Sequence, residues 1–178
     1  ATARIIGIPI QSQLTLNALH LVSGRQLATT QGSEVIASSA FASANGLVVG
    51  DRIAAVLNGR WRELRIVGTA MSPEFVYEVA PGGLLPDNRR FGVLWMDQDA
   101  LAYAFNMRGA FNDINLALSP GASQSTVIDR LDQLLSPYGG LGAYGREEQL
   151  SHRFVADELA EIRVSTSVIP SLFLGIAA

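Results

Sequence analysis

Alternating and continuous runs of apolar residues in the first half of the chain predict strands, each bounded by glycine or polar residues. The strands are expected at residues 4–8, 34–38, 52–57 and 60–68. Asn58-Gly59 separates the last two and favours a two-residue hairpin turn, because both residues tolerate positive φ. This half is therefore expected to be rich in β-structure.

One short helix and one long loop complete this half. Ser39 is placed to cap a helix over residues 40–45, which Gly46 would end in a left-handed conformation. A loop rich in proline and glycine is expected from Met71 to Arg90.

From Phe91 onwards the pattern alternates between strand and helix. The continuous apolar run at 91–96 is typical of a strand covered on both faces. Asp97 is predicted to cap a helix whose buried side carries Leu101, Ala104 and Phe105.

The remaining elements follow the same alternation, so the whole chain is expected to have an α+β fold. Residues 113–118 are predicted to form a strand whose inward residues are Ile114, Leu116 and Leu118. Ser123 is expected to cap an amphipathic helix that Pro137 ends, and a last helix is predicted from about Ser151.

The composition excludes several classes of protein. The chain has 178 residues, 48% of them hydrophobic and 16% charged, with a mean hydropathy of +0.24, which excludes intrinsic disorder. The net charge of −3 disfavours a nucleic-acid partner, which needs a basic face. All 13 basic residues are arginine, so Schiff-base lysines and phosphate-binding loops with lysine are excluded. The absence of cysteine excludes disulfides and thiolate chemistry.

No motif for catalysis or cofactor binding meets its structural requirement. Gly140–Gly145 matches the dinucleotide pattern G-x-G-x-x-G, but it follows a predicted helix instead of a strand. His20 and His152 lie in unrelated elements without metal-binding spacing, and Ser38, Ser39 and Ser72 have local roles in caps and turns. We therefore predict a non-enzymatic protein without cofactor or metal site.

The uncharged run at 164–178 is shorter than the roughly 20 residues that span a bilayer. The run alone is compatible with a buried helix or with the start of a membrane helix.

Parts of the chain resemble two known families. Gly46-Leu47, Gly50-Asp51, Ile53 and Asn58-Gly59 resemble a signature of PDZ domains, although the flanking segments do not match. A larger part of the chain, about residues 20–178, resembles the MacB-like periplasmic core domain of FtsX-like ABC transporter permeases, of the macrolide-export and lipoprotein-releasing type. The resemblance lies in the order and spacing of short sequence segments. These segments are residues 23–25, 34–38, 41–42, 46–51, 64–68, 93–96 and 120–122, followed by a predicted helix that ends in Leu134-Leu135.

The resemblance to the permeases implies an architecture and a role. It implies a Porter-like β-α-β subdomain, residues 1–32 and 92–163, with an inserted β-rich Sabre-like subdomain, residues 33–91, and the start of a membrane helix at 164–178. The domain would face the periplasm, or the extracytoplasmic side, of the cytoplasmic membrane. It would relay the motion of a cytoplasmic ABC ATPase to a protein or lipoprotein partner, in a transporter expected to be dimeric. The alternatives are a PDZ-like peptide-binding module and a small extracytoplasmic hydrolase.

Four large apolar side chains in the proline- and glycine-rich loop are the candidate partner contacts. They are Phe75, Tyr77, Leu84 and Leu85. Such side chains either dock a partner or fold back as a lid on the sheet, and the sequence leaves both possibilities open.

Overall fold

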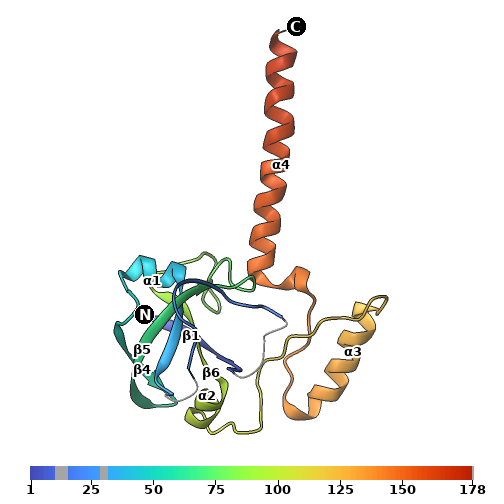
Figure 1. The fold of residues 1–178 in the computed structure, drawn as a ribbon. Coiled ribbons are helices and arrows are strands. Elements are labelled where there is room, and N and C mark those ends of the chain that lie inside the picture. Colours follow the sequence, from blue (N-terminus) through green and yellow to red (C-terminus); the bar gives the residue numbers. More distant parts are fainter. Residues whose placement is uncertain (11–15, 29–31, 178) are drawn as a thin grey trace. The chain divides into compact units, whose positions relative to one another are not determined.

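The computed structural model describes residues 1–10, 16–28 and 32–177, with side chains described as far as residue 166. The chain divides into two compact units, Ala1–Ala117 and Leu118–Ala178, which we call the first and second units. Within the described residues the first unit holds all the strands, whereas the second is built from helices and loops (Figure 1).

The first unit is organised around a mixed sheet of six strands. These are β1 Thr2–Ile8, β2 His20–Gly24, β3 Glu34–Ser38, β4 Arg52–Leu57, β5 Arg60–Met71 and β6 Phe91–Asp97. The strand order is β1-β6-β3-β5-β2, and β4 pairs with β5. β1–β6 and β3–β5 are parallel, whereas the remaining pairs are antiparallel. With its helices, this mixed sheet confirms the predicted α+β class.

Two apolar clusters cover the two faces of the sheet, because alternate residues of a strand point to opposite faces. Strand β6 contributes to both clusters and is buried along nearly its whole length, as its continuous apolar run predicted. The first cluster contains Ile8, Leu27, Ile36, Val67, Ala70, Phe91, Val93 and Trp95. The second contains Val35, Ala37, Ala42, Leu57, Leu64, Ile66, Leu94 and Met96.

Two short helices pack on the face of the second cluster. They are α1, Ser39–Asn45, and α2, Gln98–Ala104. Ala42 of α1 belongs to the second cluster, and Leu101 of α2 packs against it. The face of the first cluster is covered differently, by partly buried residues outside the helices that include Leu19, Phe75 and Ala80.

The predicted cap of α1 was wrong by one residue, whereas the predicted cap of α2 is confirmed. Ser38, the last residue of β3, caps α1, because its backbone is extended and its hydroxyl accepts a hydrogen bond from the Phe41 amide. Gly46 ends this helix at φ 66°, as expected. Asp97 caps α2, as predicted. Phe105 was expected on the buried side of this helix, but it lies beyond the end of the helix and is 40% exposed.

The predicted hairpin at Asn58-Gly59 is confirmed. Asn58 and Gly59 have φ of 49° and 74° and join β4 to β5 with Leu57 opposite Arg60. β5 is longer than predicted: its first half pairs with β4, and its second half with β2 and β3.

The strand predicted at 113–118 is wrong. The segment forms no strand, and Ile114, Leu116 and Leu118 are 41–50% exposed. An alternating pattern becomes a strand only where another strand pairs with it, and no strand of the described sheet pairs with residues 113–118. Asp113 instead forms an ion pair with Arg4 of β1.

The second unit consists of two helices and the segment that joins them. Helix α3, Gln124–Leu135, is capped by Ser123 and ends before Pro137, as predicted. Two 3-10 turns, η1 Ser136–Tyr138 and η2 Arg146–Glu148, lead to α4, Leu150–Ala177. The joining segment folds back on α3, since the Ala143 amide donates to Asp132 at 2.6 Å and Gln124 donates to Glu147.

The Porter-like and Sabre-like division stays a prediction. β3, β4 and β5 come from residues 33–91, whereas β1, β2 and β6 come from the flanking segments. All six strands lie in one sheet.

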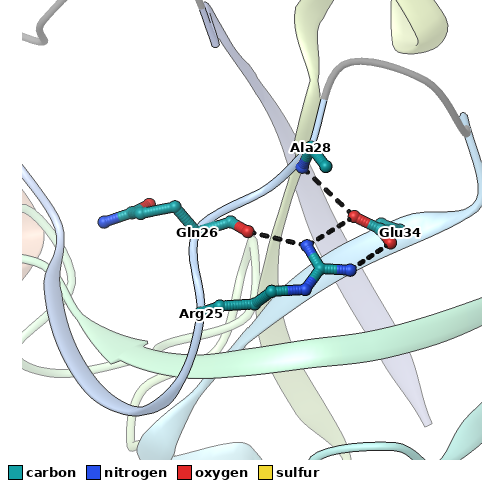
Figure 2. A network of polar contacts seen from close by, with 4 residues as sticks. All are labelled: Arg25, Gln26, Ala28 and Glu34. Carbon is teal, nitrogen blue, oxygen red and sulfur yellow. Dashed lines mark hydrogen bonds and ion pairs between the residues drawn. The ribbon is translucent and has the colours of Figure 1, made fainter.

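An arginine–carboxylate pair joins the end of β2 to the start of β3. The Arg25 guanidinium donates to both oxygens of Glu34, whose Oε2 lies 2.9 Å from Nη1, and also to the carbonyl of Gln26 (Figure 2). The Ala28 amide donates to Glu34 as well. Glu34 is only 7% exposed, and the Arg25 hydrogen bond holds the pKa of its carboxyl below the ordinary value.

Candidate functional site

The four candidate contact residues all lie in the 72–90 loop, which connects β5 to β6. The structure separates them into two pairs. Phe75 and Tyr77 are half-buried near the start of the loop, whereas Leu84 and Leu85 are 87% and 74% exposed near its middle. The loop therefore combines side chains that fold back with side chains that project into solvent.

Phe75 packs onto the sheet. Its ring meets that of Trp95 edge to face, with 6.5 Å between the centroids, and it lies against the first cluster. The Arg4 guanidinium lies 5.5 Å from the centroid of the Phe75 ring, within the range of a cation–π contact. Phe75 thus folds back on the sheet as a lid, which is one of the two arrangements that the sequence left open.

A buried carboxyl fixes the loop next to Phe75. Glu78 is 4% exposed and accepts a hydrogen bond of 2.7 Å from the hydroxyl of Ser38. Burial raises the pKa of the Glu78 carboxyl, although the bonds from Ser38 and from the Val93 amide oppose this shift. The same serine that caps α1 therefore also holds the loop.

A second carboxyl, Glu74, lies in the same stretch. It accepts a hydrogen bond of 2.7 Å from the Asn17 side chain. Burial and the nearby charge of Asp113 raise the pKa of Glu74, and Arg4 partly offsets them. Glu74 belongs to the turn expected at Ser72-Pro73. This turn is closed by a hydrogen bond of 3.1 Å from the Phe75 amide to the Ser72 carbonyl.

The far end of the loop is also held by hydrogen bonds. The Asn45 side chain donates to the Asn88 carbonyl at 3.1 Å, and Asp87 accepts from the amides of Arg89 and Arg90. Both ends are thus attached to the first unit, and Leu84 and Leu85 lie exposed between the attachments.

The residues considered for catalysis have other positions and partners. His20 lies in β2 of the first unit and His152 in α4 of the second. Within the described residues, no three His, Asp or Glu side chains gather as metal ligands. Gly140–Gly145 lies between the two 3-10 turns of the second unit and does not follow a strand.

The stretch that resembles a PDZ signature forms the link from α1 to the hairpin. Gly46 ends α1, and the Val48 amide donates to the Asp51 carboxylate at 2.9 Å in the turn that leads into β4. Local turn and strand geometry thus accounts for these residue types.

Sequence reasoning missed the two carboxyls that hold the loop. Glu74 and Glu78 stand among apolar residues in a loop, which is a weak signal, and only the fold brings Glu78 to Ser38, 40 positions away. It also missed Trp61 and Tyr103, which are 66% and 70% exposed and line a groove beside β5.

Comparison of the chain with family models, curated proteins and solved structures gives no match. Among the residues searched, which are those the structure describes, no helix has both the length and the apolar character needed to cross a membrane.

Proposed function

We propose that this chain is the extracytoplasmic domain of an FtsX-like ABC transporter permease, which relays ATPase-driven motion to a partner outside the cytoplasmic membrane. One observation carries the proposal: α4 is a single helix from Leu150 to Ala177. It joins a charged first half, which includes Arg153, Asp157 and Glu161, to the uncharged stretch from Val164 onwards.

The length and composition of α4 suit the transmission of motion. At 1.5 Å per residue, a helix of 28 residues is about 42 Å long, and its backbone hydrogen bonds make it stiff except near Pro170, which has no N–H to donate. In this proposal residues 164–178 begin a membrane helix, and the charged half leads to the rest of the second unit. A displacement at the membrane end would then be transmitted along the helix instead of being lost in a loop.

The exposed part of the 72–90 loop is the proposed partner contact. Leu84 and Leu85 are exposed, whereas Phe75 and Glu78 attach the loop to the sheet. Large apolar side chains held on an attached loop bind at a smaller entropic cost than those on a free one. The partner would be a protein or a lipoprotein, and the transporter would contain a cytoplasmic ATPase and two copies of this chain.

Breaking α4 in the complete transporter tests the proposal. We expect that Gly-Gly-Ser-Gly inserted between Ile162 and Arg163 leaves ATP hydrolysis in place but abolishes its coupling to the partner. The matched control carries the same insertion after Gly109, in a loop of the first unit. Full coupling with the α4 insertion, or equal loss with the control insertion, would contradict the role of α4.

A further inference from the structure

The chain contains two Asn-Gly pairs, and the fold places them in different local structures. Asn45-Gly46 ends helix α1, whereas Asn58-Gly59 forms the turn of the β4–β5 hairpin. Asparagine is a chemically labile residue, and a following glycine favours its deamidation because glycine has no side chain to hinder the reacting backbone nitrogen. The two pairs share this local chemistry, so any difference between their rates reports on the fold.

Deamidation of asparagine needs only the chain itself and water. The backbone nitrogen of the following residue forms a bond to the asparagine Cγ, and the bond from Cγ to Nδ2 breaks. Ammonia leaves with the proton that the backbone amide gives up, and the chain is left with a cyclic imide. Water then opens this ring at either carbonyl, so the product is an aspartate or an isoaspartate with a negative charge.

The hairpin turn is accessible to this reaction. Asn58 and Gly59 are both exposed, and nothing in the described part of the chain lies within 4 Å of the place that a Cβ on Gly59 would occupy. Leu57 pairs with Arg60, so the residues on either side of the turn close the hairpin and the Gly59 amide lies outside the strand pairing. The attacking nitrogen and water can therefore both reach the Asn58 side chain.

The turn can also change its conformation without opening the hairpin. Asn58 and Gly59 have φ of 49° and 74°, and ring closure requires rotation of the peptide group between them. Two-residue hairpins also accept a turn in which only the first residue has a positive φ, and glycine adopts either sign. The Asn58 side chain has to give up one hydrogen bond, of 3.2 Å from Nδ2 to the Ala104 carbonyl.

Asn45 is held much more firmly than Asn58. Its Nδ2 donates to the Phe41 carbonyl at 3.0 Å and to the Asn88 carbonyl at 3.1 Å. The Gly46 amide, which would be the attacking group, donates to two carbonyls of α1. Ring closure at Asn45 therefore requires the end of the helix and both side-chain hydrogen bonds to break.

We propose that Asn58 is a site of spontaneous deamidation, whereas the fold protects Asn45. The product at position 58 carries a carboxylate in place of the Nδ2 donor, and a carboxylate has no hydrogen to donate to the Ala104 carbonyl. The modified hairpin turn therefore loses this connection to α2 and gains a negative charge. The inference does not depend on the proposed function, because it concerns the chemistry of the purified chain.

Incubation of the purified folded chain near pH 8, followed by tryptic digestion and mass spectrometry, tests the proposal. Cleavage at Arg52 places the two asparagines in separate peptides, residues 26–52 and 53–60. Replacement of the amide nitrogen by oxygen raises the mass of the peptide that has reacted. We expect the peptide with Asn58 to react at least about tenfold faster than the peptide with Asn45, because several more hydrogen bonds must break at Asn45.

Two controls separate the effect of the fold from the effect of the local sequence. In concentrated urea the two peptides should react at similar rates, since both asparagines precede glycine and neither is then held by the fold. The variant Asn58→Gln keeps a side-chain amide but would have to close a larger ring, so residues 53–60 should stay unmodified while Asn45 reacts as in the parent chain.

Equal rates at the two sites in the folded chain, or a faster reaction at Asn45, would overturn the proposal. A difference that persists unchanged in urea would also overturn it, because the local sequence and not the fold would then control the reaction.

Discussion

Ser38 connects the start of α1 to the 72–90 loop. Its hydroxyl accepts from the Phe41 amide at the start of α1 and donates to Glu78 of the 72–90 loop. Replacing it with alanine removes a helix cap and leaves a buried carboxyl without this donor, so we expect Ser38→Ala to lower the free energy of unfolding by about 1–3 kcal/mol. The control Ser39→Ala should change it by less than about 0.5 kcal/mol.

Urea denaturation of the two variants measures this difference. An equal loss of stability in Ser38→Ala and Ser39→Ala would contradict this prediction, because it would mean that Ser39 contributes to the cap as much as Ser38 does.

Glu78 should make stability depend on pH in an identifiable direction. Burial raises the pKa of the Glu78 carboxyl in the folded chain above its ordinary value of 4.5. At a pH higher than this raised pKa, the folded chain holds a buried negative charge that water would solvate better after unfolding, so the charge lowers stability. As the pH falls toward 4.5, the folded state binds the proton first and this cost disappears. We expect Glu78→Gln to be more stable than the parent chain near pH 8 and to lose that advantage as the pH approaches 4.5.

Thermal unfolding at a series of pH values checks this expectation. The comparison with the parent chain removes the opposite contribution of Glu34, whose lowered pKa gives stability that is lost on acidification. A constant difference between variant and parent from pH 8 to pH 4.5 would contradict the role assigned to Glu78.

Among the elements, the 72–90 loop combines structural and exposed side chains. Because the Phe75 ring packs on Trp95, we expect Phe75→Ala to lower the free energy of unfolding by about 1–3 kcal/mol. The exposed Leu84→Ala and Leu85→Ala should stay within about 0.5 kcal/mol of the parent while weakening the binding of the proposed partner. A loss of stability in the leucine variants would show instead that this part of the loop also covers the sheet.

Elements determined by local chemistry were predictable from the sequence. The Asn58-Gly59 hairpin, the strand at 91–96 and the cap at Asp97 follow from turn geometry, continuous hydrophobicity and side-chain capping. The failure at 113–118 has a non-local cause, because a strand needs a partner that its own residues do not specify. For the same reason β2, at the edge of the sheet, was not predicted.

At the scale of the whole molecule, the strand order could not be predicted from local patterns. β1 lies beside β6 with Thr2 opposite Phe91, and this pairing depends on burial of both faces of β6. The candidate site shows the same limit: the composition of the 72–90 loop singled out its apolar residues, but only the fold separates Phe75, on the sheet, from Leu84, in solvent.

The central claim concerns the location of the first unit on the outer side of a membrane. The chain has no cysteine, so a single cysteine introduced at the exposed Val56 of the β4–β5 hairpin provides a specific label. We would treat cells that make the complete protein with a maleimide that does not cross the cytoplasmic membrane, with the parent protein as control. The account predicts labelling without lysis, in a protein that stays in the membrane fraction after alkaline washing. Labelling only after lysis, or release of the protein by the wash, would contradict it.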